Sequence, residues 1–168
     1  LNDGLTSVLA SSFLGGYSSE YASSIAIDSD GNIYITGRTL SADFPTTSGA
    51  YDTSFNSSQY SDIFVSKLNS NLTNLIASTL LGGFEGYRDE DHDSEERAYS
   101  IAIGSGGNIY IAGSTSSTDF PTTVGAYDTS YSGGSYNAFI SKLNGNLTSL
   151  LASTYLGKDN CIYSIAID

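Results

Sequence analysis

Apolar and polar residues alternate in short runs along this chain, and each run ends at glycine, serine, asparagine or aspartate. In the run at 24–28, Ile25 and Ile27 share one face, and after a glycine turn residues 32–36 alternate in the same way. Alternation with a period of two around a glycine turn is typical of a β-hairpin, whereas a helix needs apolar residues three and four positions apart. The chain is therefore expected to be all-β.

A long loop and two further strands complete this pattern. The loop, residues 38–61, is rich in serine, threonine and glycine, and Pro45 argues against a central strand there because proline cannot donate a ladder hydrogen bond. Alternation returns at 62–68 and at 75–81, with the polar turn 69–74 between them. Four consecutive strands joined by turns predict one antiparallel sheet.

The whole pattern then occurs a second time. GNIYITG at 31–37 returns as GNIYIAG at 107–113, DFPTT at 43–47 returns at 119–123, GAYDTS at 49–54 returns at 125–130, and LTNLIASTLLGG at 72–83 returns as LTSLLASTYLG at 147–157. Repeated antiparallel sheets of four strands without crossovers describe the blades of a β-propeller. A solenoid repeat is usually shorter, and a sandwich has no reason to repeat its sequence.

This interpretation gives two full repeats with a partial blade strand at each end. The predicted parts are 1–16 as the last strand of a preceding blade, 17–83 as the first blade, 84–99 as an acidic inserted loop, 100–157 as the second blade, and 158–168 as the first strand of a following blade. Propellers close with about four to eight blades. We expect a segment of a longer polypeptide, with an oligomer subunit as the alternative, and unpaired edges that invite strand addition.

The repeated motifs resemble those of a known family. GNIYITG, SADFPTTSGAYDTS at 41–54 and DIFVSKLN at 62–69 together resemble the SBBP repeat, a bacterial and archaeal propeller repeat. The resemblance implies an extracytoplasmic propeller of several blades, usually within large surface proteins, and it carries no catalytic motif to transfer. The acidic insertion and Cys161 depart from the family pattern.

Charge and composition exclude several partners. The net charge is −12 and the pI is about 4.1, so the chain has no basic face for nucleic acid or for anionic membrane surfaces. No apolar run approaches the roughly 20 residues of a membrane helix, so no membrane insertion is expected. No stretch reads as a signal peptide and methionine is absent, which fits a mature product or a piece of a longer chain.

The inserted loop concentrates acidic residues. Asp89, Asp91 and Asp93 alternate and Glu95 follows, as in loops that wrap calcium with carboxylate oxygens, although the glycine and glutamate positions of an EF-hand are not met. A charge run is usually only a solvated loop, so a solvated loop and an irregular calcium site both stay open. Calcium is the one cofactor considered. His92, in the same loop, is expected to be an exposed residue.

Three sequons predict sites of N-glycosylation at Asn56, Asn71 and Asn146. The last two lie at equivalent positions in the turn between the third and fourth strands. Short sequons also arise by chance in chains rich in asparagine, serine and threonine, so unmodified turns are the alternative.

Two other features have simple structural interpretations. Asp28 and Asp30 flank a turn, but the second repeat has Gly104 and Gly106 there, so turn chemistry explains them better than a metal site. Cys161 is the single cysteine, which excludes an internal disulfide. It is expected to be a half-buried small apolar residue, with an intermolecular disulfide or a reactive thiol as the alternative.

No catalytic motif stands out in this sequence. No serine lies in a G-x-S-x-G elbow, and no carboxylate pair recurs in both repeats. The sequence favours a non-catalytic structural or adhesive module of a prokaryotic cell-surface or extracellular protein, within a polymeric fibre or sheath. Its loops at 38–61 and 114–137 would meet further copies or other surface proteins. The alternative is a propeller that binds or degrades polysaccharide, which two close carboxylates with raised pKa in a deep cleft would favour.

Overall fold

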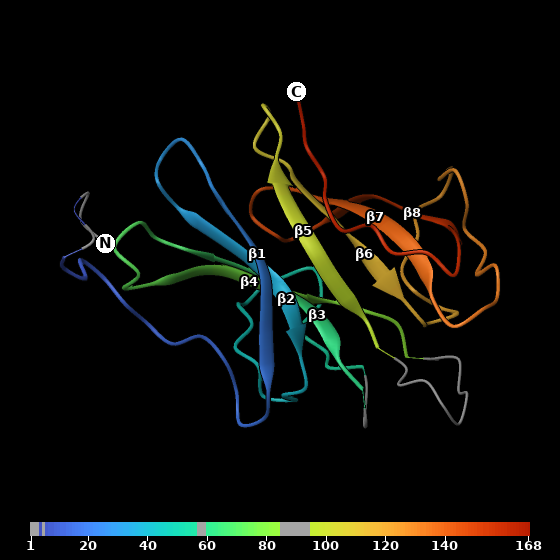
Figure 1. The fold of residues 1–168 in the computed structure, drawn as a ribbon, viewed down its shortest axis with the longest axis horizontal. Helices are drawn as coiled ribbons and strands as arrows, with labels where there is room; N and C mark the ends of the chain where they lie inside the picture. Colours follow the sequence, from blue (N-terminus) through green and yellow to red (C-terminus); the bar gives the residue numbers. More distant parts are fainter. Residues whose placement is uncertain (1–3, 5, 57–59, 85–94) are drawn as a thin grey trace.

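The computed structural model describes residues 4, 6–56, 60–84 and 95–168, and these form an all-β structure of two four-stranded antiparallel sheets (Figure 1). The described part contains no helix, and so none that could cross a membrane. In each sheet the strands follow one another in chain order without crossovers. The predicted fold class, repeated blades of a propeller, is confirmed.

Each sheet corresponds to one repeat of the sequence. Blade 1 consists of β1 (Glu20–Ile27), β2 (Ile33–Thr39), β3 (Asp62–Leu68) and β4 (Leu75–Leu81). Blade 2 consists of β5 (Arg97–Ile103), β6 (Ile109–Thr115), β7 (Asn137–Leu143) and β8 (Leu150–Lys158). The bounds predicted for the third and fourth strands of the first repeat agree with β3 and β4.

The first strand of each blade is longer than its alternation predicts. β1 begins at Glu20 because a bulge between Ala22 and Ser24 interrupts the period of two. Gly37 lies opposite this bulge, where an added Cβ would collide with the carbonyl oxygen of Tyr21. The glycine that ends the GNIYITG motif is therefore required by the close approach of two backbones.

Three boundaries of the predicted division differ from the observed elements. β5 begins at Arg97, within the segment 84–99 that was expected to be a loop, because the bulge again extends the strand. The described residues of 1–16 and residues 159–168 contain no strand, although single strands of neighbouring blades are predicted there. A strand needs a hydrogen-bonded neighbour, and no described residue of this chain pairs with either segment as a strand.

The long loop of each blade folds back along the outermost strand. In blade 1 the Leu80 N–H donates to the Asp52 carbonyl at 2.9 Å, and the Thr47 N–H donates to the Ser78 carbonyl at 3.0 Å. Blade 2 repeats the first contact, where the Tyr155 N–H donates to the Asp128 carbonyl. These bonds occupy backbone groups on the outer edge of β4 and β8, so strand addition, which the sequence predicts at unpaired edges, is blocked at these positions.

The largest apolar core lies between the two blades. β5 packs across β1 and β2, and β5 and β1 lie side by side at the centre of the molecule (Figure 1). The buried residues of this core come from both blades: Tyr34, Ile63, Val65, Ala77, Leu81, Ala98, Ile101, Ile109, Ile111, Phe120, Phe139, Leu143, Leu147 and Tyr155. The contact between the blades is therefore part of the fold.

Candidate functional site

Each sheet contributes one face to the contact between the blades, and the two faces are not equivalent. The front face of a blade is made of Ile25, Ile27, Ile33, Ile35 and Leu72 in blade 1, and of the matching Ile101, Ile103, Ile109, Ile111 and Leu147 in blade 2. The rear face is made of Tyr34, Tyr51, Val65 and Ala77 in blade 1, and of the matching Tyr110, Tyr127, Ile140 and Ala152 in blade 2. The front face of blade 2 covers the rear face of blade 1.

A turn leucine is central to this contact. Leu147 lies between β7 and β8 with a left-handed φ of 57°, and its side chain is fully buried. Its carbonyl oxygen accepts a hydrogen bond from the Tyr51 N–H at 2.8 Å. Two residues earlier, the Gly145 carbonyl accepts one from the Tyr34 hydroxyl at 3.2 Å. The turn therefore binds the rear face of blade 1 through both apolar packing and hydrogen bonds.

Each of the two faces that do not meet within the chain carries exposed apolar side chains. Ile25 on the front face of blade 1 is 61% exposed, whereas the matching Ile101 is 6% exposed. On the rear face of blade 2, Tyr127 is 88% exposed, while the matching Tyr51 is packed against the core. This rear face holds a pocket of about 360 Å³ lined by Tyr110, Val124, Tyr127, Ile140 and Leu151 among others.

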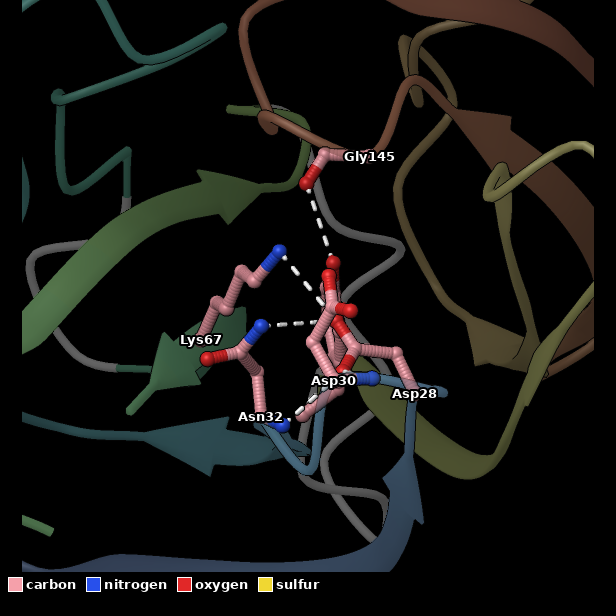
Figure 2. A network of polar contacts seen from close by, with 6 residues as sticks. Asp28, Asp30, Asn32, Lys67 and Gly145 are labelled. Carbon is pink, nitrogen blue, oxygen red and sulfur yellow. Dashed lines mark hydrogen bonds and ion pairs between the residues drawn. The ribbon is translucent and has the colours of Figure 1, made fainter. Parts of the chain in front are cut away.

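A polar cleft of about 360 Å³ lies at one end of the contact between the blades. The Asp28 carboxylate accepts hydrogen bonds from the backbone N–H groups of Asp30, at 3.0 Å, and Asn32, at 2.8 Å. It also pairs with the Lys67 ammonium group at 3.3 Å, and the Gly145 carbonyl lies nearby on blade 2 (Figure 2). Since Asp28 bonds its own turn, its role here is that of an Asx-turn residue, as the sequence predicts.

Electrostatics support this structural role. Burial opposes ionisation of Asp28, but hydrogen bonds from Asn32 and Lys67 outweigh it and lower the pKa of its carboxyl group. Burial likewise opposes the charge of Lys67, yet Tyr34 and Asp28 raise the pKa of its ammonium group. The pair is therefore an ion pair at neutral pH. In blade 2 the position of Asp28 is taken by Gly104, so this pair is specific to blade 1.

Two carboxyl groups meet inside the contact between the blades. Asp62, at the start of β3, is fully buried, and Glu96, just before β5, is 3% exposed. One oxygen of each, Asp62 Oδ1 and Glu96 Oε2, has no hydrogen-bond partner among the described residues. Both oxygens border Gly82, where an added Cβ would collide with Glu96 Oε2 and lie 3.0 Å from Asp62 Oδ1.

Burial shifts the titration of both groups. It raises the pKa of Asp62 to about 7 and the pKa of Glu96 to about 8, and the charge of Asp62 adds to the shift of Glu96. The remaining oxygens are held by donors: Asp62 Oδ2 accepts from the Asn56 N–H at 2.7 Å, and Glu96 Oε1 from the Gly83 N–H at 2.9 Å. The pair is closed off from solvent, and it lines none of the three pockets described on this part of the chain. It does not form the open carboxylate cleft that the polysaccharide alternative requires.

The calcium ligands predicted from the sequence are only partly placed. Asp89, Asp91 and Asp93, with His92, lie outside the described residues. Glu95 is described, and its carboxylate pairs with the guanidinium groups of Arg38 and Arg97. In the described ranges, no group of three or more histidine, cysteine, aspartate or glutamate side chains could hold a metal ion.

The three sequons differ in accessibility. Asn71 and Asn146 are exposed at the tips of the β3–β4 and β7–β8 turns. The Asn56 amide nitrogen instead donates to Asp52 at 3.2 Å and to the Gly82 carbonyl at 3.4 Å, so a glycan there would break these bonds. Cys161 is a half-buried free thiol.

Sequence reasoning missed the buried acidic pair and the unequal exposure of the two blades. A signal for the pair was present, because Glu20 and Glu96 occupy the same place in the repeats, and Asp62 matches Asn137. Equivalent positions that carry acids or amides beside buried strands indicate polar groups held inside the contact. The exposed faces depend on which blade has a neighbour, and a repeat pattern does not contain that information.

One comparison with known proteins bears on these observations. The model of the SBBP family, described as a β-propeller repeat, matches residues 14–45 and 97–121. The first segment contains β1 and β2, and the second contains β5 and β6, so each match falls at the same place in its blade. The comparison with curated proteins gives no match. The resemblance drawn from the motifs is therefore confirmed, since the SBBP β-propeller repeat model matches the chain at two equivalent places.

Proposed function

We propose that the chain is a non-catalytic structural or adhesive module of a prokaryotic cell-surface or extracellular protein, and that it assembles into a fibre or sheath through the faces of its blades. One observation carries this proposal. Residues that match in sequence are buried where the other blade covers them and exposed elsewhere, as the contrast between Ile101, 6% exposed, and Ile25, 61% exposed, illustrates.

The size of the exposed apolar surface supports an assembly role. Large apolar side chains stand in solvent on both free faces, among them Ile25 and Ile27 on blade 1 and Val124 and Tyr127 on blade 2. Contiguous apolar patches on a soluble protein mark interaction sites more often than single exposed residues do. The long loops are pinned to β4 and β8, so the faces offer more partner surface than the loops favoured by the sequence.

Other features support a non-catalytic, extracellular role. The two carboxyl groups with raised pKa, Asp62 and Glu96, are shut away from any substrate. Charged residues make up only 14% of the chain, and exposed sequons at Asn71 and Asn146 fit a secreted surface. These properties suit a scaffold that needs stability and exposed surface.

Sedimentation of the intact chain over a range of concentrations tests this proposal. The average mass should rise with concentration, and the double variant I25N/I27N should reduce that rise because it removes apolar area from a free face. A glycan array and a polysaccharide-degradation assay cover the rival function. A wild-type chain that stays monomeric at every concentration, or one that cleaves polysaccharide, would contradict the proposal.

A further inference from the structure

We propose that the polar cleft at one end of the contact between the blades binds a lysine or arginine side chain of a partner protein, with the Asp30 carboxylate as its anchor. The β1–β2 turn of blade 1 forms one wall, and the β5–β6 and β7–β8 turns of blade 2 form the other. All lining residues lie between Asp28 and Asn146, so both walls belong to blades that this chain itself holds together. The inference goes beyond the proposed function, because the cleft would bind this ligand whether or not the chain self-associates.

The base of the cleft is fixed by contacts within the protein. The Tyr34 hydroxyl donates to the Gly145 carbonyl at 3.2 Å and so joins the two blades (Figure 2). The Lys67 ammonium group pairs with the Asp28 carboxylate at 3.3 Å, and it lies 4.8 Å from the centre of the Tyr34 ring. The side chains of this ion pair are each only 15% exposed. Their charges cancel within the protein, so a ligand meets a base that is neutral overall.

Asp30 supplies the charge that remains in the cleft. Its backbone N–H donates to Asp28 Oδ1, but its carboxylate has no hydrogen bond or ion pair among the described residues. Asp30 is exposed, so this carboxylate can reach a ligand. Apart from Asp30 and the pair of Asp28 and Lys67, no lining residue is charged. The cleft therefore holds one uncompensated carboxylate in a chain of net charge −12, and it favours a cation over an anion.

The wall from blade 2 leaves room for a long side chain. Gly106 occupies the position that Asp30 holds in blade 1, and no atom lies within 4 Å of a Cβ added at Gly107. The half-buried Ile103 also lines the cleft and offers apolar surface to the aliphatic part of a lysine or arginine. The volume of about 360 Å³ is near the lower limit for ligand pockets, which suits one side chain.

A basic segment of another protein is the partner that this chemistry fits best. Ammonium and guanidinium groups form charge-assisted hydrogen bonds with a carboxylate. The acidic chain as a whole would also attract a basic partner and speed the encounter. A neutral sugar would gain nothing from the charge of Asp30, so the dependence of binding on salt separates the two ligands.

Three variants of the intact chain test the role of Asp30. D30N removes its charge and keeps its size. D168N is the matched control, because it removes the same charge from an exposed residue outside the cleft. D30N/G106D returns an acid to the cleft from the other wall, where the nearest atom to an added Cβ is 3.7 Å away.

NMR titration with a peptide of three lysines, blocked at both ends, measures binding and locates it. In the wild type, the shifts should concentrate in the three turns around the cleft, and added salt should weaken binding. D30N should raise the dissociation constant about fivefold, as expected for the loss of an exposed ion pair. D168N should bind as the wild type does, and D30N/G106D should recover affinity.

Several outcomes would overturn the inference. These are a wild-type chain that does not bind the lysine peptide, equal weakening by D30N and D168N, and shifts that lie outside the cleft. Binding of a neutral sugar in the cleft that displaces the peptide and does not respond to salt would also overturn it. None of these outcomes depends on self-association, so the proposed function is tested separately by sedimentation.

Discussion

Asp62 of blade 1 and Glu96 of blade 2 direct their unpartnered carboxylate oxygens toward the same place, beside Gly82, in the buried contact between the blades. By alignment of the repeats, the residues at the matching positions around blade 2 are Asn137 and Asn160. A protonated and an ionised carboxyl group can share a hydrogen bond, and so can two amides. At the matching positions both acids are therefore replaced by amides, which carry no charge when buried.

This pair makes the stability of the chain depend on pH. In an unfolded chain the pKa values are about 3.9 for aspartate and about 4.3 for glutamate. The folded chain raises them to about 7 for Asp62 and about 8 for Glu96, so it keeps protons that the unfolded chain has released. The free energy of unfolding should therefore fall as the pH rises from about 5 to about 8, by up to about 1.4 kcal/mol per pH unit for each proton held.

Chemical denaturation at several pH values measures this dependence. Other charged or titratable groups near the pair are Asp52, Tyr155 and Asp119. D62N is the control, because it installs the residue of blade 2 and should reduce the slope to the contribution of Glu96 alone. A wild-type profile that rises from pH 5 to pH 8 would contradict the raised pKa values of the two carboxyl groups.

The glycine opposite each bulge should be intolerant of any side chain. A Cβ at Gly113 would collide with the Arg97 carbonyl oxygen, which is backbone and cannot move aside. G113A should therefore lower the free energy of unfolding by at least about 2 kcal/mol. Gly106 is the control, since the nearest atom to an added Cβ is Asn108 Nδ2 at 3.7 Å. Equal melting temperatures for G113A and G106A would show that the bulge does not require glycine.

The two turn leucines should differ sharply in their contribution to stability. Leu147 is fully buried between the blades, whereas the matching Leu72 is only half-buried. L147A should cost about 2–5 kcal/mol, and L72A much less, when both are measured by urea denaturation. Both positions have a positive φ, so the backbone cost of alanine is the same and cancels in the comparison. A similar loss in both variants would mean that packing between the blades contributes little.

Calcium binding by the acidic insertion stays a prediction, and the ion pairs of Glu95 refine it. Because Arg38 and Arg97 already neutralise Glu95, E95Q should leave any calcium effect unchanged. The triple variant D89N/D91N/D93N should abolish it. Thermal denaturation in calcium and in chelator measures the effect, since a bound ion raises the melting temperature. Equal melting temperatures of the wild type under both conditions would exclude the site.

The sequence predicts the strands well wherever alternation is unbroken. β3 (Asp62–Leu68) and β4 (Leu75–Leu81) were located to the residue because apolar and polar positions alternate up to clear turn residues. The start of β1 was wrong because the bulge at Ala22 shifts the alternation by one residue. The burial of Asp62 was missed because an acidic residue at the start of a strand normally indicates a solvent-exposed position.

Long-range contacts account for the rest of what the sequence did not show. The loop of blade 1 reads as an exposed polar segment, yet the Asp52 carbonyl accepts from the Leu80 N–H and holds the loop on β4. Composition does not distinguish a serine- and threonine-rich loop that faces solvent from one that satisfies a strand edge. Likewise, Ile25 and Ile101 have the same local sequence, and only their neighbours make one exposed and the other buried.

The acidic pair also bears on how a chain of near-identical repeats avoids misfolding. Segments from the wrong repeats can pair while such a chain folds, because their strands are nearly interchangeable. Asp62 and Glu96 give one contact a buried acidic pair, whereas the matching positions of the next repeat hold Asn137 and Asn160. A segment from the wrong repeat would therefore place an amide where this contact holds an acid.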